Sequence, residues 1–111
     1  MPNSIFPEMI KDLPQVDIPL AGLVAYLVQG EKQQILFMEF EKETSVPEHS
    51  HEAQWGVVLE GRIDLTVEDE ILRLEKGDTY YIPAGAIHCA KIYAGYKDLT
   101  FFNQADRYNK K

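Results

Sequence analysis

Short apolar runs follow one another along most of this chain, and turn-forming residues separate them. From residue 62 to residue 68 the pattern alternates strictly, with Ile63, Leu65 and Val67 on one face and polar residues on the other. A period of two is typical of a strand that buries one face. The other runs are rich in aromatic and β-branched residues, which also favour strands. The predicted strands are residues 23–28, 34–40, 54–60, 62–68, 71–74, 79–82, 87–93 and 98–104.

Glycine and proline stand at the joints between these runs. Gly61 and Gly77 lie where hairpin turns need a positive φ. Pro83 presets φ, and Gly85 lets the chain reverse before the next run. About eight short strands at even spacing predict an all-β fold, a small antiparallel barrel or jelly roll.

The first part of the chain has a different pattern. Residues 1–22 contain four of the six prolines, which exclude a long helix. We expect a short helical turn over residues 6–11 and then an extended lead-in. With 111 residues, no repeat and no linker, the chain predicts a single domain in which residues 1–22 lead into a barrel at 23–111.

Composition excludes several classes of function. The net charge of −7 argues against a nucleic-acid partner, whose phosphates need a basic surface. No run approaches the roughly 20 apolar residues of a membrane span. The start of the chain lacks the basic segment of a secretory signal, so we expect a cytoplasmic protein. The single cysteine, Cys89, excludes an internal disulfide and is expected to be a small buried hydrophobe.

All three histidines fall within two short motifs, His49-Ser50-His51 and the segment that ends at His88. Residues i and i+2 of a strand point to the same side, so His49 and His51 can converge on one point. The fold would have to bring in His88. Because neutral imidazole is the commonest protein ligand for a transition metal, this distribution indicates a metal site.

These motifs resemble those of the cupin superfamily. The first motif runs from His49 to Gly61, and the second, G-x5-P-x-G-x2-H, runs from Gly77 to His88. The resemblance implies a double-stranded β-helix, or jelly-roll barrel, that binds one divalent transition-metal ion (Mn, Fe, Ni, Zn or Cu). Gln54 stands where the family usually has a glutamate, and Ile92 replaces a closing asparagine. The implied ligands are His49, His51, Gln54 and His88, with Glu52 as a rival for the fourth position.

A glutamine at this position is similar to the cupins that linearise uronates in pectin and alginate breakdown. Their last strand carries D-x-F-x-P-x-R. Arg107 aligns with its arginine, but Phe101 and Ala105 replace its aspartate and proline. The resemblance implies a metal that acts as a Lewis acid on a small sugar acid or hydroxy-carboxylate, with Arg107 and Tyr80 as candidate catalytic or substrate contacts.

Two alternatives stay open. One is a mononuclear non-heme dioxygenase, which dioxygen uptake would identify. The other is a small-molecule binding protein without turnover. The resemblance also implies a homodimer. Seven aromatic residues are candidates to wall a ligand pocket, of which Trp55, Tyr80 and Tyr81 are the most suited to place a polar group near it: Phe37, Phe40, Trp55, Tyr80, Tyr81, Phe101 and Phe102.

Overall fold

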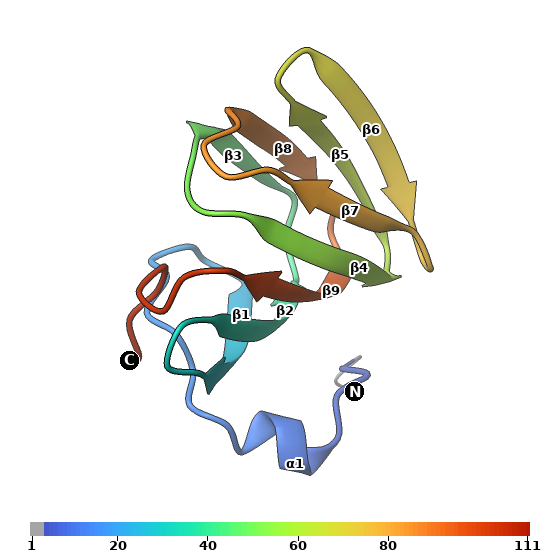
Figure 1. Ribbon diagram of the computed structural model, residues 1–111. Coiled ribbons are helices and arrows are strands. Elements are labelled where there is room, and N and C mark those ends of the chain that lie inside the picture. The colour runs from blue at the N-terminus through green and yellow to red at the C-terminus, as the bar shows by residue number, and fades with distance from the viewer. Residues whose placement is uncertain (1–3) are drawn as a thin grey trace.

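Two antiparallel sheets pack face to face in the computed structural model, which describes residues 4–111 (Figure 1). The expectations for residues 1–3 lie outside this range. A helix, α1 (Glu8–Lys11), precedes the strands. The strands are β1 (Leu23–Gln29), β2 (Gln34–Phe40), β3 (Thr44–His49), β4 (Gln54–Glu60), β5 (Arg62–Val67), β6 (Glu70–Glu75), β7 (Thr79–Ile82), β8 (His88–Ile92) and β9 (Tyr96–Phe102). One sheet has the order β1-β2-β9-β4-β7 and the other β3-β8-β5-β6.

The all-β prediction is confirmed, and β2, β4 and β7 have the predicted bounds. Strand β3 was not expected, because Pro47 and Glu48 interrupt its apolar pattern. It lies at the edge of its sheet, where a proline is tolerated because an edge strand has a hydrogen-bonded neighbour on one side only. The last strand begins at Tyr96, two residues earlier than predicted, and ends at Phe102.

The lead-in packs against both sides of the five-stranded sheet. The predicted helical turn is present as α1, and Phe6 just before it makes edge-to-face contacts with Tyr26 and Phe37 on the outer face. Further on, Val16 forms a bridge with Lys110 and is buried in the core. These contacts tie the proline-rich segment to the strands through apolar burial and through backbone hydrogen bonds, such as that from the Val16 N–H to the Ala25 carbonyl at 3.0 Å.

Alternation along β9 decides which side chains enter the space between the sheets. Tyr96, Asp98, Thr100 and Phe102 are buried, whereas the residues between them are more exposed. The outer face of the same sheet carries an apolar row that crosses all five strands. Its members are cross-strand neighbours: Val28, Ile35, Phe101, Trp55 and Tyr81.

Within residues 4–111, no helix is long and apolar enough to cross a membrane.

Candidate metal centre

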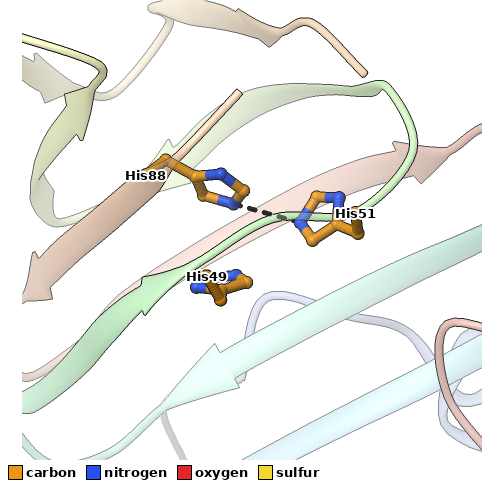
Figure 2. A group of neighbouring side chains, drawn as sticks. All are labelled: His49, His51 and His88. Atoms are coloured by element: carbon orange, nitrogen blue, oxygen red, sulfur yellow. Dashed lines mark hydrogen bonds between the residues drawn. The ribbon is translucent and has the colours of Figure 1, made fainter. Parts of the chain in front are cut away.

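The three histidines meet between the two sheets (Figure 2). His49 ends β3, and a register shift after Val46 sets it opposite His88, the first residue of β8. His51 follows in the loop before β4. The Gly85 N–H donates to its carbonyl at 2.9 Å, which ties this loop to the turn before β8. The nearest ligand atoms of the three rings all lie within 4.8 Å of one another, as expected from the motif spacing.

Each ring is held by one hydrogen bond from its Nδ1 atom to a backbone carbonyl. His49 donates to Pro47 at 2.9 Å, His51 to Glu52 at 2.7 Å and His88 to Ala86 at 2.9 Å. A neutral imidazole with a proton on Nδ1 has its free lone pair on Nε2. This arrangement therefore presents Nε2 as the ligand atom of every ring.

Two of these Nε2 atoms, those of His51 and His88, lie 3.0 Å apart. Burial lowers the pKa of His51 to about 4 and lowers that of His88, and the nearby Arg107 charge acts in the same direction. Both rings are thus neutral near pH 7, and their Nδ1 protons are already in use. Two lone pairs that face each other at this distance repel unless a cation lies between them.

The residues present fit a divalent transition metal. At metal–nitrogen distances of about 2.0–2.1 Å, two nitrogens bound to one ion lie roughly 2.8–3.4 Å apart, for octahedral or tetrahedral angles. The separation of 3.0 Å between the His51 and His88 nitrogens falls in this range. The His51 and His88 nitrogens are therefore already spaced for one ion, and His49 completes the group, in which all three ligand atoms lie within 4.8 Å of one another.

Gln54 and Glu52, the two candidates for a fourth ligand, lie in different surroundings. Gln54 begins β4 and lines the same cavity as the histidines. Glu52 is exposed and does not line this cavity. Its backbone N–H donates a hydrogen bond to the side-chain oxygen of Gln104 at 3.0 Å. The change of direction at residues 52–53, between His51 and β4, separates the two side chains.

The hydrogen bonds around Gln54 fix the orientation of its amide. The Thr100 hydroxyl donates to the Trp55 carbonyl at 3.1 Å, so it accepts from the Gln54 amide nitrogen at 2.9 Å. The Tyr80 hydroxyl donates to Asp98 at 2.8 Å and therefore also faces the amide nitrogen as an acceptor, at 3.5 Å. Since both neighbours accept, the amide carbonyl oxygen is the atom left over for another ligand.

Asp98 is a carboxylate enclosed by two tyrosines in the same cavity. Its Oδ2 accepts from Tyr80 and from Tyr96, each at 2.8 Å, while its Oδ1 is buried without a partner among the described residues. Burial raises the pKa of Asp98 to about 6, although the two tyrosine hydrogen bonds oppose this shift. The same burial and the Asp98 charge raise the pKa of both tyrosines, which keeps them protonated as donors.

Arg107 supplies the positive charge of the cavity. Its guanidinium lies 4.4 Å from the centre of the Tyr108 ring and 5.8 Å from that of Phe102. Its Nε atom is buried with no hydrogen-bond partner within residues 4–111. A buried donor on a permanent cation is suited to an anionic ligand.

Several sequence expectations about aromatic residues need correction. Trp55, Tyr81 and Phe101 are exposed on the outer face, at 43%, 59% and 37%, because they alternate along their strands with the residues that face the cavity. Of the seven candidates, the cavity is lined by Phe40, Tyr80 and Phe102. Cys89 is half-buried, less than expected.

Asp98 lines the site but was not predicted from the sequence. Alignment to the D-x-F-x-P-x-R pattern put the missing acid at Phe101, which faces outward. Asp98 lies three residues earlier, in phase with Phe102 and therefore inside. The alternation of Tyr96, Asp98, Thr100 and Phe102 was the available signal, and the late start predicted for this strand concealed it.

A family model described as "Cupin domain" matches residues 36–102, more than half of the chain. The chain belongs to the cupin family. The matched segment includes His49, His51, Gln54 and His88, whereas the lead-in and Arg107 lie outside it.

Solved cupin structures share the fold of this cupin at low sequence identity. An RmlC-like cupin from Shewanella frigidimarina is 21% identical, with a TM-score of 0.76 over 96% of this chain and 95% of that one. KdgF from Halomonas sp. is 21% identical, with a TM-score of 0.69 over 82% and 87%. Oxalate decarboxylase of Bacillus subtilis, a protein with Mn(II) centres, is 21% identical, with a TM-score of 0.72 over 91% and 31%.

A curated relative with a different overall length also matches. Mannose-1-phosphate guanylyltransferase of Sinorhizobium fredii is 31% identical over 64 residues, which are 56% of this cupin. The match spans only 12% of that relative's length, so the shared part is a segment of a much larger protein.

Proposed function

We propose that this cupin is a metal-dependent protein, acting on or binding a small carboxylate such as a sugar acid or hydroxy-carboxylate. The observation that carries the proposal is the convergence of three Nε2 lone pairs, each fixed by an Nδ1 hydrogen bond. A cation between the His51 and His88 nitrogens, which lie 3.0 Å apart, would relieve the repulsion of their lone pairs. The identity of the ion, among Mn, Fe, Ni, Zn and Cu, is not specified by imidazole ligands.

In this proposal Gln54 is the fourth ligand. Its amide nitrogen is occupied by Thr100 and Tyr80, so its carbonyl oxygen is available to the ion. Glu52 is anionic and would bind a cation more strongly, but it is exposed outside the cavity. Placement therefore favours Gln54 over the residue that charge alone would favour.

Arg107 and Tyr80 contribute differently to ligand binding. A bound divalent metal would supply Lewis-acid chemistry, by polarising an oxygen of the ligand. Arg107 places a buried guanidinium donor beside that position and would orient a carboxylate by hydrogen bonding. Tyr80 does not have a free proton to donate, because its hydroxyl is bonded to Asp98. Its proposed role is to hold Gln54, with contact to the ligand secondary.

A homodimer is also part of the proposal. The apolar row on the outer face of the five-stranded sheet supports it, because contiguous exposed apolar side chains are typical of interaction surfaces. The cytoplasmic location stays a prediction from the sequence.

The test is metal content. Wild-type protein and the His49→Ala/His88→Ala variant are purified without an affinity tag, supplied with each of the five metals, dialysed and measured by elemental analysis. We expect about one ion per chain in the wild type for at least one metal, and a near-zero content in the variant. Equal and near-zero contents in both proteins would refute the metal proposal.

The fourth ligand is tested with a matched pair of variants. Gln54→Ala removes an amide that lines the cavity, whereas Glu52→Ala removes an exposed carboxylate two residues away. Titration of the metal-free proteins by calorimetry should show weaker metal binding for Gln54→Ala and unchanged binding for Glu52→Ala. The reverse result would make Glu52 the ligand.

A further inference from the structure

The cavity between the sheets has two ends of different chemistry. Along β8, His88, Ala90 and Ile92 all face it, so that this wall changes from an imidazole to aliphatic groups within four residues. At roughly 3.3 Å per residue, the two ends lie about 13 Å apart. Leu65 and Ile63 of β5 pair with Ala90 and Ile92 and extend the apolar wall.

The facing walls at the far end are apolar as well. Met38 and Phe40 come from β2, and Leu23 begins β1. Ile18 and Leu20 of the lead-in complete this side. None of these five side chains can exchange a hydrogen bond with a ligand, so the part of the cavity away from the histidines favours hydrocarbon.

Most polar groups of the cavity are already paired. The two tyrosine hydroxyls, Tyr80 and Tyr96, are bound to Asp98 Oδ2, and the Gln54 amide nitrogen is bound to Thr100. Among the fully buried side-chain atoms of residues 4–111 that line the cavity, Arg107 Nε and Asp98 Oδ1 are left without partners. The Gln54 carbonyl oxygen and the histidine Nε2 atoms are also free, but the proposed function assigns them to the ion. A ligand with several hydroxyl groups would lose its bonds to water and find few replacements. A second anionic group would be repelled by Asp98.

The cavity volume limits the size of the ligand. It is about 220 Å³. An apolar cavity of roughly 150 Å³ holds benzene, so a body of about six carbons fits beside a carboxylate head. We infer that the ligand of this cupin is a small monocarboxylic acid with an apolar body, whose carboxylate lies by Arg107 and the histidines. This inference narrows the carboxylates of the proposed function to those with an apolar body and excludes polyhydroxylated sugar acids. The position of the head rests on the proposed function, whereas the body is argued from the cavity walls.

A matched pair of acids tests this inference. Cyclohexanecarboxylate and glucuronate each carry one carboxylate on a six-membered ring, but glucuronate also carries hydroxyl groups. Binding of both acids is measured by calorimetry to wild-type protein whose metal content has been determined beforehand. We expect a dissociation constant at least tenfold lower for cyclohexanecarboxylate, since unpaired buried hydroxyls weaken binding by about this factor or more. Equal or tighter binding of glucuronate would overturn the inference.

Variants at the apolar end locate the binding site. Ala90→Phe fills the space beside Leu65 and should weaken cyclohexanecarboxylate binding at least tenfold, while metal content and acetate binding stay unchanged. Ile92→Asn, which keeps the number of side-chain heavy atoms but replaces an aliphatic group with an amide, should reduce the difference in affinity between the two acids. Cys89 lies next to Ala90 on the same strand but does not line the cavity, so Cys89→Ala should bind both acids like the wild type. Unchanged cyclohexanecarboxylate affinity in Ala90→Phe, together with an unchanged difference in affinity between the two acids in Ile92→Asn, would refute the assignment.

Failure of the metal proposal would be seen separately. If elemental analysis finds no metal, the proposed function fails. Preferential binding of cyclohexanecarboxylate would still support the inference, provided that this binding is weakened in both Ala90→Phe and Arg107→Gln. If metal is bound but neither ring acid binds while acetate does, the proposed function stands and the apolar-body inference is wrong.

Discussion

Each histidine ring of the site is oriented by a single backbone carbonyl from a residue one or two positions away. Pro47, Glu52 and Ala86 supply these carbonyls. Because the acceptors belong to the same short segments as the rings, the tautomer is set locally and does not depend on a distant side chain. The fold then has only to bring the segments of β3 and β8 together, which their shared ladder does.

Asp98 gives a prediction about pH. Its pKa is raised by burial to about 6, above the ordinary value of 3.8, so the folded state holds the proton more tightly than the unfolded state. The free energy of unfolding therefore falls as pH rises from about 4 to about 6, by on the order of 2–3 kcal/mol from this group, and is level above. We expect the free energy of unfolding of Asp98→Asn to show no such fall over this pH range. It is measured by urea denaturation in the presence of a chelator, which removes bound metal.

The histidines act in the opposite direction and must be separated from Asp98. The folded pKa values of His51 and His88 are lowered, so the contribution of these two rings to stability is present above about 6.5 and is lost as pH falls. This contribution is common to the wild type and Asp98→Asn, and it cancels in the difference between the two curves. If the difference in free energy of unfolding between the wild type and Asp98→Asn does not change between pH 4 and pH 7, the prediction is wrong.

At the scale of the strands, Gly56 of β4 makes room for Tyr80 of β7. The two residues are cross-strand partners, and a Cβ added at Gly56 would overlap the ring carbons and hydroxyl of Tyr80. Gly56→Ala would push Tyr80 off Asp98 and Gln54. We expect a loss of about 1–3 kcal/mol in the free energy of unfolding, the usual cost of overpacking, measured by urea denaturation.

The Tyr80→Ala background is the control for this prediction. Without the ring there is nothing for the new methyl group to displace, so Gly56→Ala should cost much less there, and the two changes should be strongly non-additive. Equal costs of Gly56→Ala in both backgrounds would show that the glycine serves another purpose.

The strands also show what the sequence can predict. Alternation identified β5, and flanking turn residues identified β2, β4 and β7, because local pattern and burial agree there. The histidine cluster could be predicted because H-x-H and the turn before His88 have fixed spacing. Strand β3 could not be predicted, because it pairs with β8 at the edge of its sheet and no local sequence pattern indicates this position. The inward direction of Asp98 depended on where β9 begins, and strand ends are poorly marked in a sequence.

At the scale of the whole molecule, the exposed apolar row predicts the dimer interface. We expect wild-type protein to sediment as a dimer in analytical ultracentrifugation and the variant Trp55→Lys/Tyr81→Glu to sediment as a monomer, because buried charges oppose association. The matched control is Ile71→Lys/Ile87→Glu, which changes two equally exposed apolar residues outside the row. A monomeric wild type, or a monomeric control, would contradict this prediction.

Two residues of the cavity wall, Ile18 and Leu20, belong to neither sheet. They reach the cavity from the lead-in, a segment that precedes the part of the chain shared with the family. Substitutions there alter the shape of the ligand space without breaking a strand ladder or touching a histidine. In evolutionary terms, selection for a new ligand can act on this segment while the metal site is inherited unchanged. Divergence among close relatives should then accumulate first at these positions.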